Sequence, residues 1–303
     1  MPELPEVETI RGQLAPLVEG RRLRRIEILD PRWSRPLAPG ELAAAIEGRR
    51  IERLGRRGKY LLWCLEGEVF LAQHLRMTGA VLADPDPEPP HTRVRVELGP
   101  VRGQRGGRRL AIVDPRRFGT GELLLGADAQ EAFFAARLGL EPFDALFTAE
   151  HMRGLAKDRT APIKALLLDQ RRIAGVGNIY ADEALFRAGI HPLRPAGTLT
   201  AAQHARLREG VIAALSAGID ARGATIDDFR HVDGLPGSFQ NEFLVHRREG
   251  EPCGRCGSTI VKMVVAGRGT YVCETCQLRP RRRSLRPRAA RPDGRSRRRP
   301  GPR

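Results

Sequence analysis

The chain lacks any long hydrophobic run, and this absence narrows the classes of protein it can belong to. No apolar stretch reaches the ~18 to 20 residues of a membrane-spanning helix. The opening MPELPEVE lacks both the basic residues and the apolar core of a secretory signal peptide. We therefore expect a cytoplasmic protein. Its 303 residues, 41% of them hydrophobic, suffice for two domains with a core each.

Cysteine is scarce, and the positions of the five cysteines matter more than their number. Cys64 stands alone in the apolar run YLLWCLE and is expected to pack in a core strand. The other four form two CxxC pairs separated by sixteen residues, a spacing that lets four thiolates bind one Zn²⁺ tetrahedrally. Two disulfides are the alternative, which a reducing cytoplasm disfavours. Because the protein supplies all four ligands, we expect a structural ion, held by Cys253, Cys256, Cys273 and Cys276.

Acidic residues are the minority, with 36 Asp and Glu against 52 Lys and Arg, and the net charge is +16. Residues 279–303 contain twelve arginines and one aspartate, so this tail carries +11 and leaves +5 for residues 1–278. A tail of this composition is predicted to be disordered. The positive charge favours a polyanion as partner, although the rest of the chain is only moderately basic.

The hydrophobic pattern divides the chain into a β-rich and a helical part. Apolar residues at helical spacing predict a helix over residues 6–18, and Pro5 suits its first turn. Six short β-like runs follow, interrupted by one short helix at 41–47, which predicts a β-sandwich or barrel. Beyond about residue 127 the pattern is helical. We expect an α+β chain with a β-rich domain, a helical domain, a metal-binding finger with its preceding loop, and the tail, at residues 1–126, 140–235, 236–278 and 279–303.

Two features of the second half are candidates for anion binding. In GVGNIYADEALF, Gly175 and Gly177 form a tight turn before a helix that begins at Asn178, and the free N–H groups of a helix start favour anions. Most such turns, however, only connect elements. Between the CxxC pairs, IVKMVVAGRGTYV predicts a hairpin of the zinc-ribbon type with Arg268 at its turn. Arg268 either contacts a phosphate or faces solvent, and the spacing does not separate these alternatives.

Four motifs and the cysteine pairs together resemble one family. PELPEVETI at the start, HLRMTG at 74–79, DPRRFG at 114–119 and GVGNIYADEALF at 175–186, followed by CGRC and GRGTYVCETC, resemble the formamidopyrimidine-DNA glycosylases in order and spacing. The related endonuclease VIII group typically begins with PEGPE, whereas this chain has PELPE. The resemblance implies an N-terminal β-sandwich with a leading helix, a helix-two-turns-helix domain and a zinc finger. It also implies a monomer at the nucleoid, with double-stranded DNA in the cleft between the two domains.

The resemblance further implies removal of oxidised purines such as 8-oxoguanine and formamidopyrimidines, followed by cleavage of the strand at the abasic site. It assigns the nucleophile to the amine of Pro2, exposed once Met1 is removed. An α-amine has a reference pKa of ~7.7 to 8, so a useful fraction is neutral near pH 7. Glu3 would be the acid and base, Glu6 would support it, and Lys59 would contact the phosphate beside the lesion.

The remaining residues that the resemblance assigns would bind DNA. A glycosylase must extrude the target nucleotide, and apolar side chains commonly fill or wedge the stack. Met77 and Arg116 would fill the gap left by the extruded base, and Phe118 would insert into the opposite stack; without the resemblance, Met77 and Phe118 would be assigned to the core. The expected phosphate contacts are His74, Lys164, Asn178 and Arg268.

The chain departs from the family pattern at two places. Ser238 stands where many members have an aromatic residue, and His246 and Arg247 stand where a Tyr-Gly pair is frequent. These departures concern lesion preference and one phosphate contact. Two alternative functions are an oxidised-pyrimidine glycosylase of the endonuclease VIII type and a non-catalytic zinc-finger DNA-binding protein.

Overall fold

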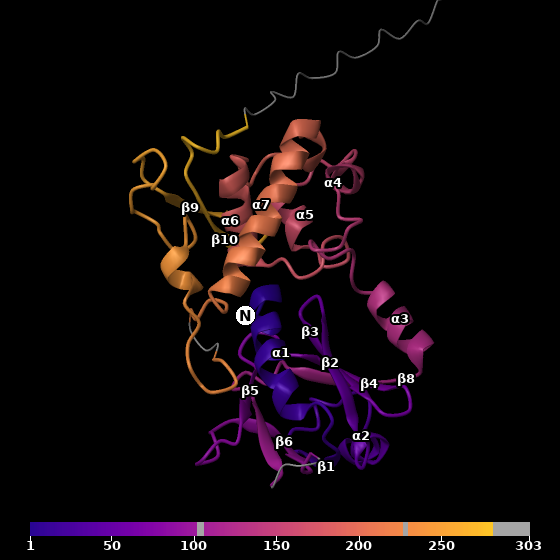
Figure 1. The fold of residues 1–303 in the computed structure, drawn as a ribbon. Coiled ribbons are helices and arrows are strands. Elements are labelled where there is room, and N and C mark those ends of the chain that lie inside the picture. The colour runs from indigo at the N-terminus through magenta and orange to yellow at the C-terminus, as the bar shows by residue number, and fades with distance from the viewer. Residues whose placement is uncertain (102–105, 227–229, 281–303) are drawn as a thin grey trace, which may run out of the picture.

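The computed structural model describes residues 1–101, 106–226 and 230–280, so most of the expected disordered tail lies outside the described residues. Figure 1 shows two lobes, one built on strands and one built on helices, with helix α1 (Leu4–Val18) at their junction. We call them the β-lobe, which holds β1 to β8, and the helical lobe, which holds α4 to α7. Within the described ranges, no helix is long and apolar enough to cross a membrane.

The β-lobe is a sandwich of two four-stranded antiparallel sheets, ordered β1-β6-β7-β5 and β2-β3-β4-β8. Its core takes Leu54 and Trp63 from one sheet and Val94 from the other, with Ile10 of α1 packed against them. This confirms the predicted β-sandwich with a leading helix. The strands are β1 (Leu23–Ile28), β2 (Ile51–Arg57), β3 (Tyr60–Leu65), β4 (Val69–His74), β5 (Ala80–Ala83), β6 (Thr92–Leu98), β7 (Arg108–Val113) and β8 (Thr120–Leu125), and α2 (Pro39–Ile46) lies between β1 and β2.

Strand β3 is buried on both faces, which explains its unbroken apolar sequence. Leu61 and Trp63 face the sandwich core. Leu62 and Cys64 face a second cluster that includes Phe133 of α3 (Ala127–Ala135). Cys64 is therefore a core residue, as predicted.

The hydrophobic pattern did not predict β5 and β8. Strand β5 has only four residues and follows the tight turn at Gly79, so it shows too little alternation to be recognised. Strand β8 begins with the polar run Thr-Gly-Glu and runs directly into α3. Both strands form because they pair with longer strands, β7 and β4, rather than because of their own composition.

The helical lobe packs α6 (Asn178–Ala188) against the long helix α7 (Ala201–Asp220). Thr200 caps α7, and its hydroxyl accepts a hydrogen bond from the backbone N–H of Gln203. Leu4 of α1 is buried in this lobe's core, whereas Val7 and Ile10 of the same helix are buried in the sandwich core. Helix α1 thus joins the two cores and places the N-terminal residues between the lobes. The lobe also contains α4 (Ala149–Ala156), α5 (Ile163–Leu168) and the short helices η1 (Ala196–Thr198) and η2 (Phe239–Glu242).

The chain continues from the helical lobe into the predicted hairpin. Strands β9 (Val261–Val265) and β10 (Arg268–Val272) pair antiparallel, and β10 packs against α6. The loop before the hairpin lies beside the N-terminal region in Figure 1. This places the start of β10 at the same junction as the start of α1.

Candidate active site between the lobes

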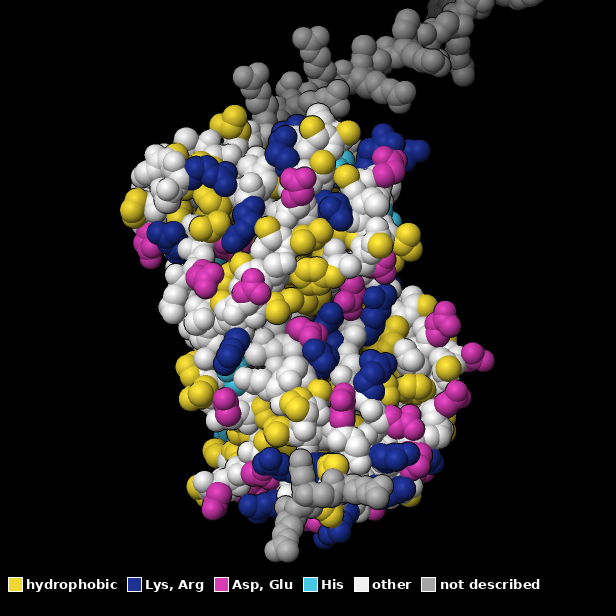
Figure 2. Space-filling view, in the orientation of Figure 1, with side chains coloured by type: hydrophobic (Ala, Val, Ile, Leu, Met, Phe, Trp, Pro, Cys, Tyr) yellow, Lys and Arg dark blue, Asp and Glu magenta, His cyan; other side chains and the backbone are white. Residues whose placement is uncertain are grey.

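A cavity of about 510 Å³ lies between the lobes and brings together residues from most of the sequence motifs. Figure 2 shows that the molecule narrows at this junction, where several Lys and Arg side chains gather. The wall includes the exposed Met1, with Pro2 buried directly beneath it. Most of the predicted site residues line the cavity: Glu3, Lys59, His74, Met77, Arg116, Asn178 and Arg268.

The Glu3 carboxylate is buried and only half satisfied. One oxygen, Oε1, accepts a hydrogen bond from the backbone N–H of Ile179 at 3.0 Å, in the first turn of α6. The other oxygen, Oε2, is buried and has no hydrogen-bond partner. A helix N-terminus favours a negative charge, so the anion that we expected near Gly177 is supplied by the protein itself. Glu3 lines the cavity, and its second oxygen is left with an unfilled hydrogen-bonding position.

The glycine turn before α6 is shaped by the N-terminal residues. A Cβ on Gly177 would lie 2.3 to 2.6 Å from the carboxyl atoms of Glu3, which leaves no room for any side chain. Gly175 has φ +91° and packs against Leu4, and its carbonyl accepts a hydrogen bond from the Leu4 N–H at 3.1 Å. Both glycines are therefore needed for close backbone approach, as expected, but the group they approach is the start of α1.

Glu6 connects the start of α1 to two segments of the helical lobe, namely helix α6 and the segment after α7. Its carboxylate accepts hydrogen bonds from the Glu3 N–H at 2.8 Å, the Tyr180 hydroxyl at 2.7 Å and the Ala224 N–H at 2.8 Å. Burial, with the Glu3 carboxylate nearby, raises the pKa of Glu6 above its ordinary value. A carboxylate with three donors is held in one orientation, so Glu6 orients the backbone that carries Glu3.

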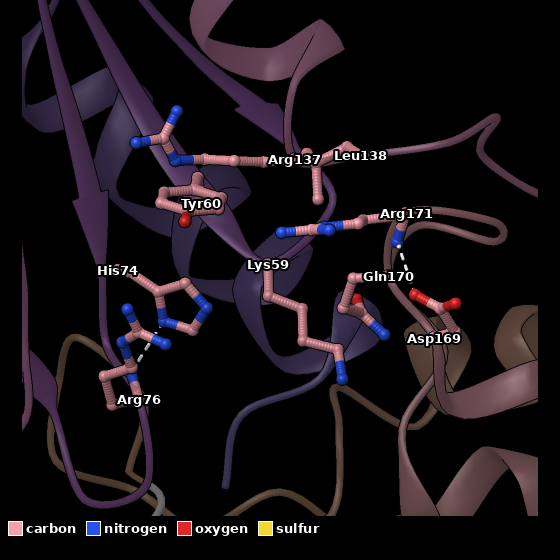
Figure 3. Close-up of a pocket in the computed structure, with 9 residues that line it drawn as sticks. All are labelled: Lys59, Tyr60, His74, Arg76, Arg137, Leu138, Asp169, Gln170 and Arg171. Carbon is pink, nitrogen blue, oxygen red and sulfur yellow. Dashed lines mark hydrogen bonds between the residues drawn. The ribbon is translucent and has the colours of Figure 1, made fainter. Parts of the chain in front are cut away.

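Lys59 and His74 line this cavity and also an adjoining pocket, which Figure 3 shows. Burial lowers the pKa of Lys59, although the charges of Glu3 and Glu6 oppose this shift. Burial, together with the charges of Arg76 and Lys59, lowers the pKa of His74 to about 3. The Nδ1 of His74 accepts a hydrogen bond from the Arg76 N–H at 2.9 Å, so the neutral ring carries its proton on Nε2. A neutral imidazole of this tautomer can donate that N–H to a phosphate.

The motifs HLRMTG and DPRRFG form two loops joined by one buried carboxylate. Asp114 accepts hydrogen bonds from the Thr78 hydroxyl at 2.5 Å and from the Gly119 N–H at 2.7 Å. Arg116 and Phe118 project from the second loop, and the Arg116 guanidinium lies 5.0 Å from the centre of the Phe118 ring. Phe118 is 51% exposed, so it is not a core residue and is free to contact a partner.

On the opposite wall, Asn178 and Arg268 bring the hairpin to the cavity. The Asn178 side-chain amide donates to the Gly269 carbonyl at 2.9 Å, while its Oδ1 is buried without a partner. Arg268 begins β10 and is exposed at the cavity. The hairpin is thus connected directly to the first residue of α6.

Lys164 occupies a different environment from the other predicted DNA contacts. Its side chain is fully buried, and its ammonium lies 2.6 Å from the Asp182 carboxylate and 2.7 Å from the Thr270 hydroxyl. Asp182 also pairs with His246 Nδ1 at 2.9 Å. Lys164 is not among the residues that line the cavity. The structure gives it the position of a support beneath β10, where it cannot reach a ligand without breaking a buried ion pair.

Gln170, Arg76 and His246 are among the cavity-lining residues that were not in the predicted set. Gln170 donates to the Val176 carbonyl at 2.7 Å and accepts from the Gly175 N–H at 3.0 Å, which orders the turn before α6. No local pattern indicated Gln170, because it follows an ordinary helical segment. Arg76 lies inside the HLRMTG motif, where its charge was a usable signal. His246 was noted only as a departure from the family.

The four clustered cysteines meet the geometric requirements of a zinc site. Their sulfur atoms all lie within 4.8 Å of one another, and the Sγ atoms of Cys253 and Cys276 are 3.9 Å apart. Tetrahedral ligands at ~2.3 Å from Zn²⁺ are ~3.8 Å apart, whereas a disulfide needs ~2.05 Å. The donor set therefore fits one structural zinc and not two disulfides, as predicted. The ion would connect the two knuckles that hold the β9–β10 hairpin, and with it Arg268.

Comparison with known proteins agrees with this architecture. The family model of the formamidopyrimidine-DNA glycosylase N-terminal domain matches residues 1–121, that of its H2TH domain matches residues 138–230, and that of a zinc finger found in FPG and IleRS matches residues 250–279. A formamidopyrimidine-DNA glycosylase of Roseiflexus sp. is 45% identical to this chain, and the match covers 91% of this chain and 100% of that protein. One from Thermus thermophilus is 47% identical, over 91% and 98% of the two chains.

Solved structures give the same result. The MutM (Fpg) protein of Thermus thermophilus has a TM-score of 0.80 to this chain at 46% identity, covering 91% of this chain and 98% of that one. Lactococcus lactis Fpg in complex with DNA containing an abasic site has a TM-score of 0.83 at 34% identity, covering 91% and 100%. The chain therefore belongs to the formamidopyrimidine-DNA glycosylase family, the DNA glycosylases of base-excision repair that also have abasic-site lyase activity.

Proposed function

We propose that this chain removes oxidised purines from double-stranded DNA and that the amine of Pro2, exposed once Met1 is removed, is its nucleophile. The observation that carries this proposal is the Glu3 carboxylate, which has one buried oxygen without a partner beside residue 2. An unsatisfied buried acceptor is costly, and such groups are typical of sites that complete their hydrogen bonding with a substrate. Met1 lines the cavity, so its removal would leave the Pro2 nitrogen at the cavity wall.

The chemistry follows from these two neighbours. The lone pair of the neutral Pro2 nitrogen attacks C1′ of the extruded nucleotide, and the bond from C1′ to the base breaks with its electron pair on the base, which takes up a proton. The nitrogen loses its own proton, its lone pair then breaks the C1′–O4′ bond, and Glu3 in its protonated form donates a proton to O4′. Because proline is a secondary amine, the product is a cationic iminium, which acidifies the C2′ proton. Loss of that proton expels the 3′ phosphate, and a second elimination expels the 5′ phosphate. Glu6, with its three donors, would keep Glu3 in place through these steps.

The phosphate contacts are assigned to groups on both walls of the cavity. Lys59 and the Nε2–H of His74 would bind phosphates from the β-lobe, and Asn178 and Arg268 from the helical lobe. Met77, Arg116 and Phe118 would occupy the space that base extrusion opens. We assign Lys164 a supporting role, because its ammonium is fully buried against Asp182.

Capture of the covalent intermediate tests the nucleophile. Borohydride should trap the processed chain on abasic-site DNA, and Pro2→Gly should retain some trapping because it keeps a free α-amine. A chain that retains Met1 should bind the same DNA without being trapped. Equal trapping with Met1 retained would rule out Pro2, and binding without any trapping by the processed chain would favour the non-catalytic alternative.

The lesion class needs a separate experiment. Lactococcus lactis Fpg has been solved with DNA containing a Fapy-dG and with DNA containing an oxidised pyrimidine, so the scaffold accommodates both. We expect faster base release from 8-oxoguanine paired with cytosine than from thymine glycol, and the reverse order would favour the endonuclease VIII type. Location at the nucleoid, where the DNA substrate lies, is part of this proposal.

A further inference from the structure

A second cavity, of about 320 Å³, adjoins the candidate active site, and its lining includes four cations. It lies between the start of β3, the end of β4, the segment after α3 and the loop after α5 (Figure 3). The lining contains one carboxylate and four basic side chains. The basic residues are Lys59, Arg76, Arg137 and Arg171. The three arginines are not among the DNA-binding residues that the family resemblance implies.

These cations are poorly neutralised by the protein. The Lys59 ammonium and the guanidinium groups of Arg76 and Arg171 make no hydrogen bond or ion pair with any described residue. The one carboxylate, Asp169, is already engaged, because it lies 3.0 Å from the Arg172 guanidinium and accepts the Arg171 N–H at 3.1 Å. Arg137 lies 3.8 Å from Glu122, and its guanidinium also donates to the Phe133 carbonyl at 3.1 Å and lies 3.9 Å from the centre of the Phe133 ring, so its charge is only partly neutralised. Glu3 and Glu6 act on Lys59, but the guanidinium groups of Arg76 and Arg171 have no paired carboxylate among the described residues, and such groups attract an anion.

Two observations indicate that the positive charge of these side chains is felt inside the cavity. In Figure 3 the Arg171 side chain extends from the loop after α5 toward Lys59 and Tyr60 rather than away into solvent. The His74 ring lies on the same wall, and its lowered pKa has the charges of Arg76 and Lys59 among its causes. A phosphate would be stabilised by all of these groups.

The two cavities share four lining residues, namely Lys59, His74, Arg76 and Gln170. A strand bound in the active site at Lys59 therefore has a continuous path into the second cavity. Arg137 and Arg171 line only the second cavity, Arg137 from the segment after α3 and Arg171 from the loop after α5. This order matches a polyanion with regularly repeated charges better than a single small ion.

We propose that Arg171, with Arg137 and Arg76, forms a second phosphate subsite that binds the lesion strand next to the phosphate held at Lys59. This subsite rests on the proposed function, because it needs the lesion strand to pass Lys59. Its ligand is one backbone phosphate of that strand. The subsite fixes the direction in which the strand leaves the active site but makes no contact with the reacting atoms.

The salt dependence of DNA binding tests the subsite. Arg171→Gln and Arg137→Gln should each weaken binding to a duplex with a tetrahydrofuran abasic analogue by roughly tenfold at low salt. Each should also reduce the slope of log affinity against log salt by about 0.9, the value for one lost phosphate contact on duplex DNA. Arg25→Gln is the matched control, because Arg25 is exposed on β1, away from the cleft, and should behave as wild type.

A chemical double-mutant cycle identifies the phosphate. Single phosphates of the lesion strand are replaced in turn by neutral methylphosphonates, and the effect of Arg171→Gln is measured on each duplex. The effect should disappear at one phosphate, adjacent to the one at which a Lys59→Gln effect disappears. Additive effects at every position, or an equal loss with Arg25→Gln, would overturn the subsite.

Borohydride trapping of the wild type separates this test from the proposed function. If the wild type is not trapped on abasic-site DNA, the proposed function fails and the subsite with it. If the wild type is trapped but Arg171→Gln and Arg137→Gln keep the wild-type salt slope, only the subsite fails.

Discussion

The Glu3 carboxylate accepts a hydrogen bond from the backbone N–H of Ile179 at 3.0 Å, although 176 positions separate the two residues. This contact joins the start of α1 to the start of α6 across the junction of the lobes. It orients the carboxylate with one oxygen on the helix N-terminus and leaves the other without a partner. The candidate acid and base is therefore positioned by the helical lobe, while its backbone belongs to the helix that leads the β-lobe.

Gly177→Ala should disrupt this contact. A Cβ at position 177 would lie 2.3 to 2.6 Å from the Glu3 carboxyl atoms, so Glu3 or the turn must move. We expect a loss of base release of about 100-fold or more, the range that removing a general acid and base produces. Gly154→Ala is the control, because a Cβ there meets nothing within 4 Å and should stabilise α4 by up to ~1 kcal/mol. Normal base release by Gly177→Ala would contradict the assigned geometry.

Glu3→Gln should abolish proton transfer without removing the hydrogen bond to Ile179. The amide oxygen still accepts that N–H, so the melting temperature should change little while single-turnover release of 8-oxoguanine falls by roughly 10² to 10⁴. Glu8→Gln serves as the comparison, since Glu8 is another carboxylate of α1 that pairs with Arg11 and Arg56 instead of facing the cavity. A similar rate loss in both variants would show that the effect of Glu3 is not specific.

His74 predicts a pH dependence of stability. Its pKa is about 3 in the folded chain and near 6.5 when unfolded, so between these values the unfolded state binds the extra proton. Stability from the neutral ring is complete above pH 6.5 and decreases as the pH falls toward 3. Between pH 7 and pH 5 the wild type should lose about 2 kcal/mol more unfolding free energy than His74→Gln. Urea unfolding at both pH values measures this, and parallel losses in the two proteins would contradict it.

The buried pair of Lys164 and Asp182 should matter for stability. Asp182→Asn leaves the Lys164 ammonium fully buried without its counter-charge, which should cost about 3 to 5 kcal/mol in urea unfolding. Arg153→Gln removes an exposed, solvent-screened ion pair with Glu150 and should leave the free energy of unfolding nearly unchanged. The double change of Lys164→Met with Asp182→Asn should cost less than the sum of the single changes. Strict additivity would show that the two side chains do not interact.

Removal of zinc should abolish DNA binding before the β-lobe unfolds. The four thiolates hold the knuckles of the β9–β10 hairpin, which carries Arg268. Both tryptophans of the chain, Trp33 and Trp63, are buried in the sandwich core and report on the β-lobe alone. A chelator should therefore weaken DNA binding while tryptophan fluorescence stays unchanged. Unchanged binding after measured zinc release would exclude this role for the finger.

The sequence determined those features that depend on near neighbours in the chain. Helical spacing marked α1, and the CxxC pairs marked the zinc ligands, because each pattern is complete within one element or one turn. The order of the motifs was enough to identify the family. Strands β5 and β8 did not follow from local patterns, since they form only through pairing with longer strands.

Only the tertiary structure decided how the site residues are used. No local pattern separates Lys59, whose ammonium faces the cavity without a partner, from Lys164, whose ammonium is buried against Asp182. The structure also shows that the anion expected at the helix start after Gly177 is the Glu3 carboxylate. The Glu3–Ile179 contact joins residues 176 positions apart, and the Lys164–Asp182 pair joins two different helices, so both form only when the chain packs in three dimensions. The sequence thus specified the chemical groups, and the packing of the lobes specified which of them remain available to DNA.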